Sequence, residues 1–188
     1  MDDNEMRCRQ LLGLLSLTFA LTGCQLIGQA SSIMDTSIAK LSSQVGLGPN
    51  SVESVGVMAG YGGPPAAAVV EIAFAYGDAA MAVLSQANVT TWYTERAGYC
   101  RSYSNQLDVL RLEVPMGYSA LVAELPADHA TAQAIFIFVK GVGKADVTTM
   151  KTPWVSIVEG ELTVLEAPPG SMKSSNGIVA ENGVKPLC

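Results

Sequence analysis

The chain has 188 residues and a net charge of −6 at pH 7. It carries no basic patch and no interleaving of basic with aromatic residues, so the composition excludes the usual nucleic-acid-binding proteins. The length is sufficient for one domain with a sizeable core.

Residues 1–23 are predicted to be a signal peptide that is removed. The apolar run 11–21 is shorter than the roughly 20 residues that span a bilayer, and Arg7 and Arg9 precede it, as is typical of secretion signals. A cleaner signal begins at Met6, so two starts remain open.

The apolar run ends in "LTGC", residues 21–24, which resembles the lipobox of bacterial lipoproteins. The resemblance implies that the Cys24 thiol carries a diacylglycerol thioether and that cleavage occurs before it. Two or more acyl chains anchor a protein stably, and this covalent lipid is the only group we expect the chain to carry. Gln25 in place of the Asp that marks inner-membrane retention favours the outer membrane, facing the periplasm. The alternative is a plain apolar helix with a chance cysteine.

Residues 24–55 are predicted to form the lipid anchor, a tether and an amphipathic helix. The helix is indicated by apolar residues on one face at spacings of four, three and four, and it ends before a Gly- and Pro-containing stretch. The residues of this face are Met34, Ile38, Leu41 and Val45. Two interpretations remain: the helix packs on the main domain, or it docks a partner.

Cys100 and Cys188 are the two cysteines left after cleavage and acylation. An even pair in an oxidising compartment predicts a disulfide. It would close a loop of about 90 residues and stabilise the fold by about 4–5 kcal/mol in the chain-entropy model. The alternative is two free thiols.

Residues 56–188 are predicted to form a mainly β, two-sheet β-sandwich with short helical insertions and a polar C-terminal tail. Short strands with frequent turns are typical of this class. A tight hairpin is expected at Glu159-Gly160, a helix over 78–87 with Asp78 as its cap, and a flexible boundary over 56–66. The expected strands cover 68–76, 107–114, 119–125, 133–141 as a central strand, and 89–96, which alternates in part.

No arrangement of residues predicts catalysis. His129 lies alone in a polar turn, and "GYSAL", residues 117–121, lacks the second glycine of a nucleophile elbow. No Cys/His spacing predicts a metal site. The sequence therefore favours a binding or structural protein over an enzyme.

The stretch from Val69 to Leu165 resembles the TssJ (VasD/SciN) lipoproteins of type VI secretion systems. The resemblance lies in "VVEIAFAY", in "LRLEVPMGYSALVAELP", and in "AIFIFVKG" followed by Trp154. The turn departs from the family pattern because Met116 separates Pro115 from Gly117. The resemblance implies a transthyretin-like sandwich that docks a secretion-system membrane complex to the outer membrane.

The partner implied is the periplasmic part of a TssM-like inner-membrane protein, bound through a loop that falls here within Asn88–Ser104. Aromatic and Arg side chains are enriched at interface hot spots, and this segment contains Trp92, Tyr93, Arg96, Tyr99, Arg101 and Tyr103. The interpretation that Trp92 and Tyr93 belong to the core stays open. The second hypothesis is a periplasmic lipoprotein that binds a ligand or an envelope component.

Overall fold

The computed structural model describes a single unit of the chain. Contacts divide the chain into Met1–Gln44 and Val45–Cys188, and every described residue belongs to the second unit. The predicted signal peptide, the anchor at Cys24 and the predicted helix over 33–45 lie outside the described residues. The structure describes residues 49–60, 67–169, 178–179 and 183–188.

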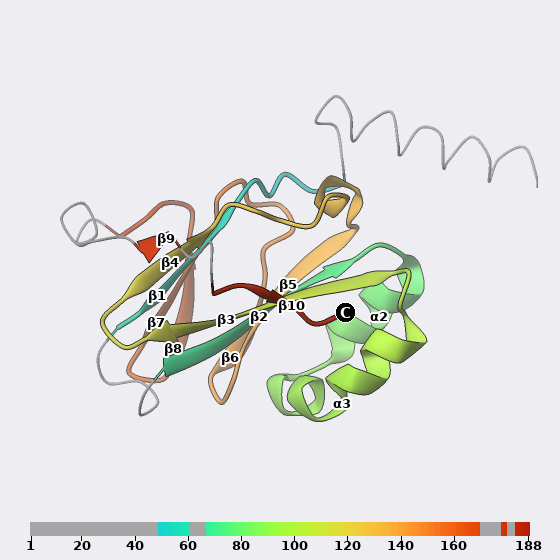
Figure 1. The fold of residues 1–188 in the computed structure, drawn as a ribbon, viewed down its shortest axis with the longest axis horizontal. Helices are drawn as coiled ribbons and strands as arrows, with labels where there is room; N and C mark the ends of the chain where they lie inside the picture. Colours follow the sequence, from blue (N-terminus) through green and yellow to red (C-terminus); the bar gives the residue numbers. More distant parts are fainter. Residues whose placement is uncertain (1–48, 61–66, 170–177, 180–182) are drawn as a thin grey trace, which may run out of the picture. The chain divides into compact units, whose positions relative to one another are not determined.

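Two sheets pack against each other, and two helices cover the outer face of one of them (Figure 1). The β1 sheet has the order β8 (Glu161–Leu165), β7 (Trp154–Val158), β1 (Val55–Ala59), β4 (Ser119–Val122) and β9 (Ile178–Val179). The β2 sheet has the order β10 (Lys185–Pro186), β3 (Leu107–Pro115), β2 (Ala67–Ala75), β5 (Ala134–Val139) and β6 (Gly143–Asp146). The helices are α2 (Asp78–Gln86) and α3 (Val89–Ser102), and a 3-10 turn, η1 (His129–Thr131), precedes β5. The predicted mainly β, two-sheet sandwich with helical insertions is confirmed.

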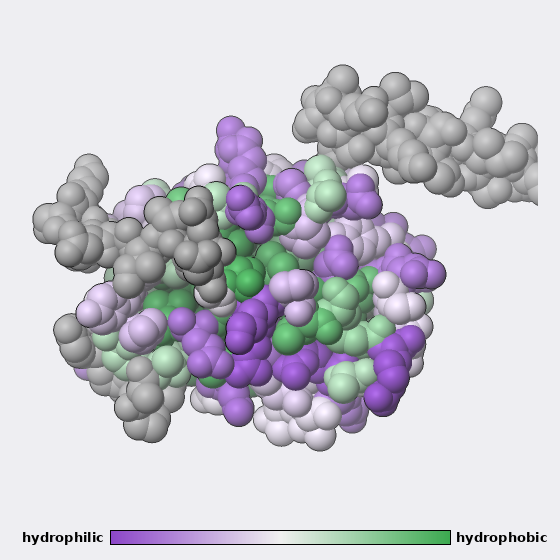
Figure 2. Space-filling model, viewed as in Figure 1, coloured by the Kyte–Doolittle hydropathy of each residue, from purple (hydrophilic) through white to green (hydrophobic). Residues whose placement is uncertain are grey.

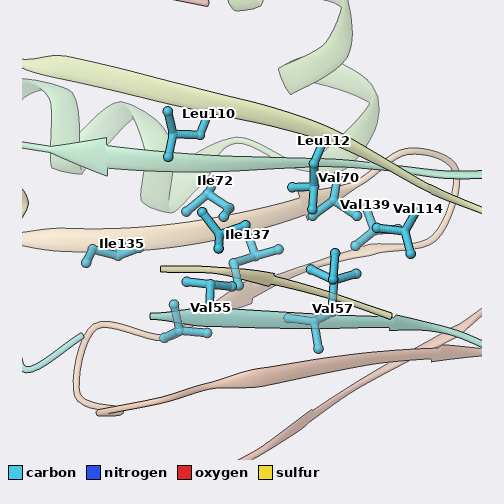
Figure 3. Close-up of a cluster of buried hydrophobic side chains, with 14 of the residues drawn as sticks. Val55, Val57, Val70, Ile72, Leu110, Leu112, Val114, Ile135, Ile137 and Val139 are labelled. Atoms are coloured by element: carbon cyan, nitrogen blue, oxygen red, sulfur yellow. The ribbon is translucent and has the colours of Figure 1, made fainter. Parts of the chain in front are cut away.

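Strand β2 is buried on both faces because successive side chains point to opposite sides of a sheet. Val70, Ile72 and Phe74 enter the core between the sheets. Val55 and Val57 of β1 lie opposite Val70 and Ile72 there (Figure 3). Ala73 and Ala75 face the helices instead. The β2 sheet is therefore the middle layer of the domain.

Residues 89–96, which were predicted to alternate in part as a strand, belong to helix α3. The run Val89-Thr90-Thr91 is β-branched and favours a strand locally, but the Asn88 side chain accepts a hydrogen bond from the Thr91 N–H and caps a 14-residue helix. The predicted cap of α2 is also wrong. Gly77 is the N-cap, and Asp78 lies in the first turn. There its negative charge interacts favourably with the positive end of the helix dipole.

The flexible boundary predicted over 56–66 is wrong at its start, because Val55–Ala59 form strand β1. It lies in the middle of its sheet, pairing parallel with β7 and antiparallel with β4. Gly56 is buried beneath the Trp154 indole, and a Cβ there would lie 2.2 Å from the ring. The glycine thus makes room for a tryptophan rather than breaking the chain. Residues 61–66 lie outside the described residues.

Two other predicted features are confirmed. Strand β5 lies between β2 and β6, and all six of its residues are buried. Strands β7 and β8 form an antiparallel hairpin in which Glu159 and Gly160 have φ of 53° and 80°, the left-handed pair that a type I′ turn requires.

Candidate interaction site on helix α3

The six predicted partner-binding residues lie on a helix, not on a loop. Trp92, Tyr93, Arg96, Tyr99 and Arg101 belong to α3, and Tyr103 is its C-cap. Arg101 is exposed, whereas Tyr93, Arg96, Tyr99 and Tyr103 are half-buried and Trp92 is fully buried.

Trp92 is a core residue and must be removed from the predicted contact surface. Its ring stacks on Phe138 of β5 with centroids 4.4 Å apart. Its indole Nε1–H donates a 2.8 Å hydrogen bond to Oε2 of Glu71 on β2. A side chain with no exposed surface cannot contact a partner directly. It can influence binding only by holding its helix in position.

Glu71 fixes the position of α3 from beneath. Its carboxylate is fully buried, and its Oε1 accepts a hydrogen bond from Arg96 of α3 and lies 3.8 Å from Arg111 of β3. A buried carboxylate needs opposite charge and hydrogen-bond donors to offset its lost hydration. Glu71, Arg96, Arg111 and the Trp92 indole satisfy one another across three elements.

Glu71 is the one charged residue in the apolar stretch 68–76, and the sequence alone assigns it no role. Arg96 was predicted to bind a partner, and the structure shows it bound to Glu71 with 24% of its side chain exposed. A single carboxylate inside a buried strand is a signal for a buried ion pair, although it does not identify the partner.

Tyr93 fastens the middle of α3 to the sheet. Its hydroxyl lies 3.1 Å from the carbonyl oxygens of both Val69 and Phe138 and shares its one proton between them. Burial, followed by the nearby negative charge of Glu71, raises the pKa of Tyr93 far above its ordinary value.

The last turn of α3 is attached covalently to the end of the chain. Cys100 and Cys188 form a disulfide across 88 residues of sequence, as the sequence predicts. Tyr99, in the same turn, stacks on Trp92 at 6.0 Å and donates a hydrogen bond from its hydroxyl to Glu95. Arg101 forms no ion pair with any described residue.

The exposed side of α3 is therefore polar and rigidly mounted. It consists of Thr90, Thr94, Glu95, Ala97, Arg101 and Ser102. The ion pair at Glu71, the Tyr93 hydroxyl and the disulfide hold the helix at three points along its length. Such a surface is preorganised, which lowers the entropy lost on binding a partner.

A pocket of about 540 Å³ lies beside β3, outside the core between the sheets. Hydrophilic side chains gather on this face, over β3 and β10 (Figure 2). The pocket is lined by Arg111, Leu112, Glu113, Gly183, Lys185 and Leu187.

The residues considered for catalysis do not converge. His129 is half-buried, with its Nδ1 2.8 Å from the Pro126 carbonyl oxygen. Ser119 of "GYSAL" is buried at the start of β4 and pairs with Met58. Within the described ranges, no three His, Cys, Asp or Glu side chains are grouped as metal ligands.

Comparisons with protein-family models, curated proteins and solved structures find no match to this chain. In the part of the chain that the structure describes, no helix combines the length and apolar character needed to cross a bilayer.

Proposed function

We propose that this chain is an outer-membrane-anchored periplasmic lipoprotein that acts as a docking subunit of a type VI-like secretion complex. The anchor is Cys24 of the lipobox, and the partner is the periplasmic domain of a TssM-like inner-membrane protein. The proposal is supported by the sequence resemblance to TssJ lipoproteins and by a sandwich fold compatible with it.

The observation that carries the docking role is the rigid mounting of α3. Arg101 is exposed at the C-terminal end of the helix, and the half-buried rings of Tyr99 and Tyr103 lie beside it in sequence. Arg and Tyr are residue types that dominate interface hot spots. We therefore restrict the predicted contact to the exposed face of α3 around Arg101.

Site-specific crosslinking in membranes tests the proposal. A photoreactive amino acid replaces Ala97, which is exposed on α3 one turn before Arg101, or Lys151, which is exposed on the loop before β7. We expect position 97, and not position 151, to capture an inner-membrane protein with a periplasmic domain. Equal capture at both positions, or capture of other proteins only, contradicts the proposal.

The affinity of the captured partner provides the quantitative test. Arg101→Glu should weaken binding at least about tenfold, since truncating a hot spot typically costs about 2 kcal/mol. Lys151→Glu makes the same change of charge away from α3 and is the control. Unchanged binding in Arg101→Glu would place the contact elsewhere.

The alternative function, binding of a ligand or envelope component, is favoured by the pocket beside β3. Its volume lies within the range of small-molecule sites, about 300–1,000 Å³. Lys185 offers it a cationic group, whereas Arg111 is paired with Glu113 and lies beside Glu71. Native mass spectrometry of protein purified from membranes tests this alternative, which requires a bound species besides the acyl chains.

A further inference from the structure

The C-terminal segment lies as a short strand along the edge of β3. Lys185 and Pro186 pair antiparallel with Arg111 and Leu110. One step further, the Leu187 N–H donates a 2.8 Å hydrogen bond to the carbonyl oxygen of Val109. Among the described strands, β10 is therefore one of the two edge strands of the β2 sheet, and it covers β3 (Figure 1).

Non-covalent contacts hold this segment only sparsely. Strand β10 is two residues long, and one of them, Pro186, has no N–H to donate. Lys185 and Pro186 are both exposed. Leu187 and Cys188 are partly buried at the margin of the apolar cluster beneath the helices, and Val184 is partly buried against the core between the sheets.

The covalent attachment compensates for this sparse pairing. Cys188 is bonded to Cys100 on α3, and α3 is itself fixed to the sheet through Glu71 and Tyr93. Both ends of the disulfide are half-buried, at the margin of the apolar cluster beneath the helices rather than inside it.

Removing the segment would open a strand edge. Alternate residues of β3, Val109 and Arg111, direct their backbone groups away from β2 and toward β10, in register with Leu187 and Lys185. Uncovered backbone N–H and C=O groups on a strand edge are a template for pairing with another extended chain.

We propose that the Cys100–Cys188 disulfide is a redox-controlled latch, which keeps the C-terminal segment on β3 when oxidised and releases it when reduced by a dithiol. A thiolate of the dithiol attacks one sulfur of the disulfide and forms a mixed disulfide, leaving the other cysteine as a thiolate that takes up a proton. The second thiol of the reductant then displaces the remaining cysteine. Two electrons and two protons pass to the cysteines, and the dithiol becomes a disulfide.

Hydrogen exchange on the full chain tests the latch. After treatment with dithiothreitol without denaturant, both cysteines should become alkylatable. The Leu187 and Arg111 amides should then exchange at least about tenfold faster and lose most of their protection, whereas core amides such as that of Ile137 should lose only the protection that the stabilising effect of the crosslink gave them. If the disulfide is reduced only in denaturant, or if Leu187 keeps its protection after reduction, the latch is disproved.

A double variant distinguishes release of the C-terminal segment from any other effect of dithiothreitol on the protein. Cys100→Ser combined with Cys188→Ser should show the fast exchange at Leu187 and Arg111 without dithiothreitol, and the reductant should not change it further. Ser102→Ala, an exposed substitution on α3 that leaves both cysteines in place, should exchange as the oxidised wild-type chain does. A double variant that exchanges like the oxidised chain would show that non-covalent contacts alone hold the segment.

Discussion

At the scale of single residues, one buried carboxylate connects the helical layer to the sandwich. Glu71 lies on the helix-facing side of β2, and its oxygens meet the Trp92 indole and the Arg96 guanidinium. Breaking a fully buried ion pair costs about 3–5 kcal/mol. Arg96 and Arg111 retain side-chain exposures of 24% and 32%, so water can partly replace Glu71 and the cost should be lower.

We predict that Glu71→Gln lowers the free energy of unfolding by about 2 kcal/mol. The neutral amide leaves Arg96 and Arg111 without their buried counter-charge. Glu113→Gln is the matched control because Glu113 pairs with the same Arg111 at 2.7 Å but is 58% exposed. It should change stability by no more than about 0.5 kcal/mol. Urea unfolding measures both, and equal effects would contradict the role given to Glu71.

Replacing glycine by alanine should have opposite effects on stability at Gly56 and at Gly98. A Cβ at Gly56 would collide with the Trp154 ring, so Gly56→Ala should destabilise the domain by about 2 kcal/mol and shift the tryptophan fluorescence. A Cβ at Gly98, within α3, would meet nothing within 4 Å. Gly98→Ala should therefore stabilise by about 0.5–1 kcal/mol, because alanine favours the helix. A loss of stability in Gly98→Ala would contradict the open environment described for it.

At the scale of elements, two half-buried tyrosines fasten α3 and the end of β2 to their neighbours through their hydroxyls. Tyr93 joins α3 to β2 and β5. Tyr76 donates a 2.7 Å hydrogen bond to Asp108 of β3. Burial first, and then the hydrogen bond to Asp108, raises the pKa of Tyr76 above its ordinary value, as burial does for Tyr93. Ionising either hydroxyl would place a negative charge against oxygen atoms.

These raised pKa values predict loss of stability at alkaline pH. Because the pKa of each tyrosine is higher in the folded than in the unfolded chain, the contribution is complete below the ordinary value of 10.0 and is lost as the pH rises above it. Urea midpoints measured from about pH 8 to 11 should fall above about pH 10. Tyr93→Phe should reduce the slope of this fall relative to the wild-type chain. An unchanged slope in this variant would contradict the assignment.

At the scale of the whole molecule, the predicted anchor determines where the domain can act. A lipid on Cys24 would hold the domain at the periplasmic face of the outer membrane, from which a docking surface on α3 could engage a protein reaching across the periplasm. Stable anchoring requires two or more acyl chains, so the modification at Cys24 is a condition of the proposed function.

We predict that Cys24→Ser abolishes labelling by palmitate and leaves an uncleaved precursor, since serine has no thiol for the thioether. Cys8→Ser removes a cysteine that precedes the predicted cleavage site and should label and mature normally. Metabolic labelling followed by gel analysis distinguishes the two variants. Palmitate uptake by Cys24→Ser would disprove the anchor.

Local patterns of sequence determined most of the sandwich. Alternation and apolar runs predicted β3 and β5, and Glu159-Gly160 predicted the hairpin, because the two-residue side-chain period and turn geometry depend only on neighbouring residues. The disulfide was also predictable, since it followed from the number of cysteines and the predicted compartment.

Only the tertiary structure decided the elements whose stability comes from distant residues. The β-branched start of α3 is held as a helix partly by the bond from Trp92 to Glu71, 21 residues away. Strand β1 uses Gly56 to accept Trp154, almost 100 residues later in the chain. Burial of Trp92 likewise removed it from the predicted interface. In each case a long-range packing or ionic contact outweighed the local preference, and no short window of sequence contains both partners of such a contact.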